Sequence, residues 1–181
     1  MKRPKFVLIT GICILVLATL TVFHYSRGEE AKNIPKMNIS ENSKQEEIEE
    51  VESIKSLVSN FGDRLKMVSL LAPEDVLLES IEKNYGKFIS KALLEKWKAN
   101  PQTAPGRLTS SPWPDRIEIL SIDSISKGVY EVKGMIIEVT STEQTSEEAT
   151  SKIPVVLKIV EQDGRWLIDE LIIDNSFIPE N

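Results

Sequence analysis

The chain has 181 residues, of which 41% are hydrophobic and 28% are charged, a composition that suits one globular domain better than a disordered chain. Its only cysteine, Cys13, and its only histidine, His24, exclude an internal disulfide, thiolate metal clusters, histidine zinc sites and catalysis by Ser-His or Cys-His pairs. The net charge is −6, and the charged residues of positions 1–28 are all basic, so the rest of the chain is more acidic still. An acidic body of this kind argues against nucleic-acid binding.

Residues 6–23 (FVLITGICILVLATLTVF) begin at Phe6, end at Phe23 and contain no charged side chain. As a helix they would measure about 27 Å, close to the thickness of the hydrocarbon core of a membrane. Basic residues precede this segment, so the positive-inside rule predicts a single-pass protein of the cytoplasmic membrane, with the N-terminus inside and the body outside. Residues 1–28 are therefore an anchor or a signal segment, and cleavage before Glu29 with secretion of the body is the open alternative.

The polar residues 29–47 lack a hydrophobic period, which predicts a flexible linker. The extracytoplasmic domain is expected to cover residues 48–178. Ser43 and Glu46 have the spacing of a helix capping box, and the apolar residues that follow recur at helical spacing. This pattern predicts a first helix that ends near Ala72.

Two shorter helices are predicted next. Pro73 and the acidic residues after it favour the start of the second helix, which Gly86 is expected to end. Ser90 has the position of an N-cap for the third helix, and Pro101 is expected to stop it. Three helices are therefore expected before any strand.

After a proline-rich loop the hydrophobic period changes to two. Strands are predicted at residues 116–126, 129–140, 153–161 and 165–174. Lys127-Gly128 and Asp163-Gly164 predict tight turns, and residues 141–152 predict a long polar hairpin loop. Helices followed by an antiparallel meander indicate an α+β domain with about four strands.

Residues 164–169 (GRWLID) place a glycine turn before a tryptophan in the last strand, and residues 104–116 (APGRLTSSPWPDR) are rich in proline. The order of helices and strands over about residues 48–178 resembles that of the nuclear-transport-factor-two-like superfamily, also called the ketosteroid-isomerase or cystatin-like fold. Residues 164–169 are similar to the last-strand pattern of this group. The second segment resembles a signature of small membrane-anchored, uncharacterised proteins of Gram-positive bacteria. The resemblance implies that the helices pack into a curved, cone-like antiparallel sheet and that the tryptophan points inward. This fold hosts isomerases, dehydratases, secretion scaffolds and binding modules.

Two candidate ligand-binding residues lie in residues 104–116. Arg107 offers a planar fork of donors, and Trp113 is held between two prolines. The alternative is structural: Trp113 plugs the open end of the cone, and Arg107 pairs with an acid such as Asp115. We expect the plug, because a tryptophan is more often packed than presented.

Further candidates belong to an isomerase-like site, which needs a carboxylate base that faces a tyrosine inside the cone. By residue type this requirement leaves Asp169 and Glu170 in the last strand as bases, with Tyr85 and Tyr130 as donors. Asp169 and Glu170 are expected on opposite faces of their strand, so at most one of them points inward. We expect these carboxylates to be surface groups.

The sequence thus favours a membrane-anchored extracytoplasmic binding or scaffolding module over an enzyme. A small-molecule isomerase or lyase that uses the cone pocket is one alternative, and a component of an envelope secretion or conjugation machine is another. No metal, cofactor or nucleic acid is implied. The expected partners are the membrane, through Phe6 to Phe23, and an unidentified protein or small molecule; homo-oligomerisation stays open.

Overall fold

The computed structural model describes residues 39–141 and 151–173. The chain divides into two compact units between Gln45 and Glu46, and the core and the sheet belong to the second unit. Among the described residues, no helix is both long enough and apolar enough to cross a membrane. The predicted span, residues 6–23, lies outside the described residues.

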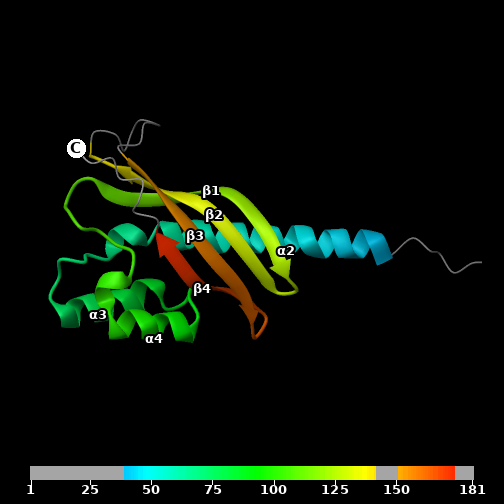
Figure 1. Ribbon diagram of the computed structural model, residues 1–181, viewed down its shortest axis with the longest axis horizontal. Helices are drawn as coiled ribbons and strands as arrows, with labels where there is room; N and C mark the ends of the chain where they lie inside the picture. Colours follow the sequence, from blue (N-terminus) through cyan, green and yellow to red (C-terminus); the bar gives the residue numbers. More distant parts are fainter. Residues whose placement is uncertain (1–38, 142–150, 174–181) are drawn as a thin grey trace, which may run out of the picture. The chain divides into compact units, whose positions relative to one another are not determined.

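The helices come before the strands (Figure 1). The α-helices are α2 (Ile39–Gly62), α3 (Glu74–Tyr85) and α4 (Lys91–Ala99), and the short 3-10 helices are η1 (Leu65–Met67) and η2 (Pro101–Thr103). The predicted starts of α3 and α4 are confirmed. Pro73 is the N-cap of α3, and the Ser90 hydroxyl accepts a hydrogen bond from the Leu93 amide at 3.1 Å at the start of α4.

The predicted bounds of the first helix are wrong at both ends. Helix α2 begins at Ile39, so residues 39–47, which were predicted to be flexible, are helical. These residues are mostly Glu, Gln, Lys, Ser and Asn, of which Glu, Gln and Lys favour a helix without any apolar period. At the other end α2 stops at Gly62, but Leu65 and Val68 are still fully buried. The apolar spacing therefore continued beyond the end of the α-helix.

The strands form one antiparallel sheet in the order β1-β2-β3-β4. Their bounds are β1 (Trp113–Ser126), β2 (Val129–Val139), β3 (Ser151–Gln162) and β4 (Arg165–Ile173), which confirms all four predicted strands with small differences at their ends. Both predicted turns are also confirmed. Asp163 and Gly164 have φ angles of 53° and 71°, the left-handed backbone of a two-residue hairpin turn. Most of the predicted long loop, residues 142–150, lies outside the described residues.

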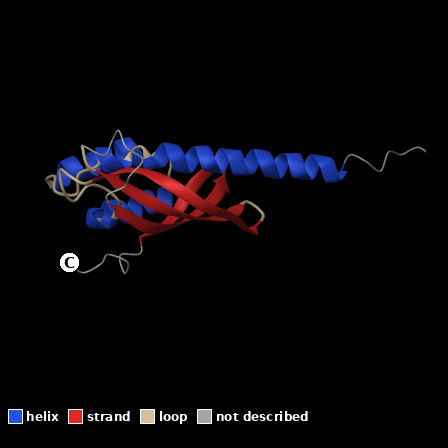
Figure 2. Cartoon of the chain, turned by 90° about the horizontal axis from the view of Figure 1, so that it is seen from above, coloured by secondary structure: helices blue, strands red, loops and turns tan. Residues whose placement is uncertain are grey.

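The core lies between the helices and one face of the sheet (Figure 2). Phe61 of α2, Tyr85 of α3 and Trp97 of α4 form its aromatic centre, with ring centroids 5.0 to 6.5 Å apart. Buried aliphatic residues from every strand complete it: Ile117, Val132, Ile136, Val155, Leu157, Ile159 and Ile168. Three helices packed on a four-stranded antiparallel sheet make this an α+β fold.

Each outer strand of the sheet has a feature that limits further pairing. Residues 88–90 cover the edge of β4, where the Ile168 amide donates to the Phe88 carbonyl at 2.9 Å and the Ser90 amide donates to the Ile168 carbonyl at 2.8 Å. Strand β1 changes register three times against β2. Such bulges bend a strand and make its edge a poor template for another chain.

Candidate functional site

The loop of residues 104–112, between η2 and β1, is fixed to the segment that follows η1. The Arg107 amide donates to the Val68 carbonyl at 2.8 Å, and the Arg107 carbonyl accepts from the Leu70 amide at 2.9 Å. These are the bonds of a short parallel pairing between the two segments. Backbone hydrogen bonds therefore hold the 104–112 loop in place, although it contains no helix or strand of its own.

Two further contacts hold the same part of the loop. The buried Tyr85 hydroxyl donates a hydrogen bond to the Pro105 carbonyl at 2.7 Å. At Gly106 the backbone passes so close to the neighbouring segment that an added Cβ atom would lie 2.7 Å from the Val68 carbonyl oxygen. A side chain at position 106 would therefore displace the loop, so glycine is required by close approach here.

The 104–112 loop, the two 3-10 helices and one end of the sheet line an open pocket of about 540 Å³, which we call the sheet-end pocket. The antiparallel order brings the starts of β1 and β3 and the ends of β2 and β4 to this end. Its lining is mainly aliphatic and includes Leu65, Leu70, Leu108, Ile136, Ile153, Leu171 and Ile173. Its volume falls within the range of roughly 300–1,000 Å³ that is usual for small-molecule sites.

Few polar side chains line the sheet-end pocket. Gln102, Thr103 and Thr109 each donate a hydrogen bond to a backbone carbonyl, at distances of 2.7 to 3.1 Å. Glu138, near the end of β2, is the only charged side chain in the lining that the structure describes. Within the described ranges no group of three or more His, Cys, Asp or Glu side chains is placed to hold a metal ion.

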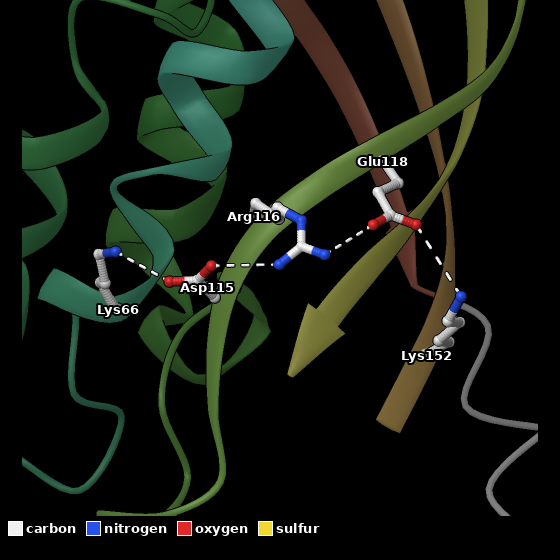
Figure 3. A network of polar contacts seen from close by, with 5 residues as sticks. All are labelled: Lys66, Asp115, Arg116, Glu118 and Lys152. Atoms are coloured by element: carbon white, nitrogen blue, oxygen red, sulfur yellow. Dashed lines mark hydrogen bonds and ion pairs between the residues drawn. The ribbon is translucent and has the colours of Figure 1, made fainter. Parts of the chain in front are cut away.

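A chain of alternating charges connects η1 with the same end of the sheet (Figure 3). Lys66 lies 3.0 Å from Asp115, and Arg116 contacts both Asp115 at 3.4 Å and Glu118 at 2.8 Å. Lys152 of β3 completes the chain at 4.0 Å from Glu118. The hydrogen bond to Glu118 is the main cause that raises the pKa of Arg116 above its ordinary value. All five groups are partly exposed, so each pair contributes little stability by itself.

The sequence predicted that Arg107 pairs with an acid such as Asp115 and that Trp113 plugs the open end of the cone, and the structure shows neither contact. Asp115 is bound within this charged network, so the predicted pair between Arg107 and Asp115 is wrong. Arg107 is partly buried, and its Nε atom is buried without a hydrogen-bond partner among the described residues. Trp113 is only partly buried, pairs across β1 and β2 with Val139, and is absent from the lining of the sheet-end pocket. Leu108 and the loop backbone, rather than Trp113, form the wall.

Tyr130 lies at the far end of β2 from Glu138. Its hydroxyl donates a hydrogen bond to the Glu50 carboxylate at 2.7 Å, and its ring meets Trp166 edge to face at 5.4 Å. Chiefly because of the bond to Glu50, and then because of burial, the pKa of Tyr130 is raised to about 12. Trp166, predicted to point inward, is partly buried and packs against the core.

Asp169 belongs to a different part of the surface. Its carboxylate lies 3.4 Å from Lys158 on the neighbouring strand, and it lines a separate hollow of about 230 Å³ with Lys96 and Glu170. The structure therefore does not gather Arg107, Trp113, Tyr130 and Asp169 around one cavity.

Sequence reasoning missed Glu138, although a signal for it exists. Tyr130, Val132, Gly134 and Ile136 alternate on the buried face of β2, and Glu138 continues the same alternation. An acidic residue at an inward position near the end of an apolar strand indicates a functional or rim position. The aliphatic lining was also missed, because its members are far apart in the sequence.

Comparison with known proteins gives little to add to this geometry. No protein-family model and no curated protein matches the sequence. A crystal structure of a protein of unknown function from Bacteroides thetaiotaomicron VPI-5482 is similar, with a TM-score of 0.40 and 16% sequence identity. The match covers 74% of this chain and 95% of that chain.

Proposed function

We propose that the chain is an extracytoplasmic binding module that residues 6–23 anchor in the membrane and that holds a small apolar molecule in the sheet-end pocket. The observation that carries the binding role is the pocket itself: about 540 Å³ with a mainly aliphatic lining. Apolar pockets with a few placed polar groups are the usual form of small-molecule sites. The uncharged run from Phe6 to Phe23, with basic residues before it, supports the anchor.

The placement of the candidate catalytic groups supports binding over isomerase or lyase chemistry. The Tyr85 hydroxyl donates to the Pro105 carbonyl, and the Tyr130 hydroxyl donates to Glu50. Asp169 lies beside Lys158 and outside the lining of the sheet-end pocket. An acid–base pair needs a base within hydrogen-bond reach of the reacting proton and close to a donor for the developing charge.

We further propose that the body belongs to the nuclear-transport-factor-two-like superfamily and that its sheet is cone-like. Three helices precede a four-stranded meander, as in that group, and the register shifts in β1 supply places where the sheet can bend. The sheet-end pocket would then lie at the open end of the cone.

The binding role is tested with a matched pair of leucines. Leu108 and Leu120 are each 64% exposed, but only Leu108 lines the sheet-end pocket. Binding of the neutral probe 1-naphthalenemethanol to the full chain is measured by calorimetry for Leu108→Asp, Leu120→Asp and the unsubstituted protein. Because burial of a leucine side chain is worth about 1.5–3 kcal/mol, Leu108→Asp should weaken binding by about fivefold or more, and Leu120→Asp should leave it unchanged.

Two outcomes would contradict the binding role. One is the absence of saturable binding of the neutral probe to the unsubstituted chain. The other is an equal loss in the two variants, which would place the probe on the general surface and not in the pocket.

A further inference from the structure

Glu138 differs from the other partly buried carboxylates of the described strands. There are five such carboxylates: Asp115, Glu118, Glu131, Glu138 and Asp169. All of them except Glu138 lie within 4.0 Å of a lysine or arginine nitrogen. Among the described residues Glu138 has no such cation and no hydrogen-bond donor, although it faces the largely apolar sheet-end pocket.

The neighbours of Glu138 across the sheet explain why it has no cation. Its partners are Pro114 on β1 and Ser151 on β3, and neither carries a charge. The nearest lysine in register, Lys152, pairs with Ile137, and its Nζ atom lies 4.0 Å from Glu118. A carboxylate that loses part of its water without a positive partner is costly, and a cation that arrives from outside removes that cost.

We propose that the ligand of the sheet-end pocket is a small molecule with an apolar body and a protonated amine, which Glu138 binds by a charge-assisted hydrogen bond. This inference rests on the proposed binding role and adds the class of ligand. The aliphatic lining covers the apolar body. Glu138 as the only charged side chain in the described lining favours a cation over a neutral group and disfavours an anion.

The test uses three probes that share one ring system and differ in their head group: 1-naphthylmethylammonium, 1-naphthalenemethanol and 1-naphthoate. Their dissociation constants are measured by isothermal titration calorimetry on the full chain in phosphatidylcholine nanodiscs, with empty nanodiscs as the blank. The cation should bind about tenfold more tightly than the neutral probe, and the anion about tenfold more weakly. Glu138→Gln should reduce both ratios to within about threefold of one.

Glu131→Gln is the matched control, because it removes the same charge from the same strand at a partly buried position outside the sheet-end pocket. It should keep the tenfold preference for the cation. The inference is overturned if the unsubstituted chain has no preference for the cation over the neutral probe. It is also overturned if this preference survives Glu138→Gln, or if it falls equally in Glu131→Gln. In each of these outcomes, neutral-probe binding that Leu108→Asp weakens would leave the proposed binding role intact. Failure of the neutral probe to bind would instead overturn the binding role itself.

Discussion

Each of two buried tyrosines donates its hydroxyl proton to one fixed hydrogen-bond acceptor. Tyr85 and Tyr130 are both at most 5% exposed, and each donates its proton at 2.7 Å. The acceptor is the Pro105 carbonyl in one case and the Glu50 carboxylate in the other. A buried hydroxyl needs such a partner, because leaving it unsatisfied would cost the desolvation energy of the group.

The raised pKa of Tyr130 predicts that the free energy of unfolding depends on pH at alkaline pH. The ordinary pKa of the phenol is 10.0, and in the folded protein it is raised to about 12. The folded state therefore keeps the proton that the unfolded state releases, so this contribution is complete below pH 10.0 and is lost as the pH rises toward 12. Tyr130→Phe should lower the free energy of unfolding by about 1 kcal/mol at pH 8, and by progressively less above pH 10.

Urea unfolding from pH 8 to pH 12 measures this difference. A difference between the two proteins that stays constant over the whole range would contradict the raised pKa. Tyr85 titrates at high pH as well, because burial raises its pKa, but it is present in both proteins and cancels in the comparison.

At the scale of elements, the 104–112 loop forms part of the lining of the sheet-end pocket although it is neither helix nor strand. Its position comes from the pairing of Arg107 with Val68 and Leu70, and from the close approach at Gly106. The loop therefore contacts the helical layer and also lines the sheet-end pocket. Its stability depends on the contacts at both of its faces.

Tyr85→Phe should test this dependence. The phenylalanine ring keeps the packing against Phe61 and Trp97, but the Pro105 carbonyl loses its donor. We expect a loss of about 1–2 kcal/mol in the free energy of unfolding and severalfold weaker binding of 1-naphthalenemethanol. Tyr130→Phe is the matched control, since it removes a hydroxyl far from the pocket.

Chemical denaturation and calorimetry on both variants provide the measurement. Stability should fall in both proteins, and probe binding should weaken only in Tyr85→Phe. Equal probe affinity in the two variants would show that the hydrogen bond to Pro105 does not position the loop for binding.

At the scale of the whole molecule, charge and hydrophobicity are divided unevenly along the chain. The uncharged run from Phe6 to Phe23 follows basic residues, whereas the body is acidic. An acidic net charge disfavours binding to anionic lipids and nucleic acids. The proposed attachment to the membrane uses the N-terminal segment, whose uncharged run is long enough to span.

The proposed topology predicts which part of the chain a protease can reach. Protease added to intact spheroplasts should digest the body of residues 29–181, because the positive-inside rule places it outside the membrane. Immunoblotting with an antibody to the body follows the digestion, and a cytoplasmic marker protein that stays intact is the control. Protection of the body until the spheroplasts are lysed would mean that the orientation is wrong.

Local sequence patterns were enough to predict three α-helices, four strands and the α+β class, although not the bounds of α2. The N-cap at Ser90, the turn at Asp163-Gly164 and the alternation in the four strands all act within a few residues, so the sequence shows them directly. The end of α2 was predicted wrongly because Leu65 and Val68 keep a helical spacing of buried residues after the helix has ended.

The site was decided only by the tertiary structure. Glu138 acquires its uncharged cross-strand neighbours from the strand register, and the sheet-end pocket brings together residues as distant as Leu65 and Ile173. The partners of Asp115 and Tyr130, Lys66 and Glu50, also come from other elements. Secondary-structure propensity depends on residues that are near in the sequence. Pockets and charge pairs depend on which distant segments pack side by side, and a single sequence does not show that packing.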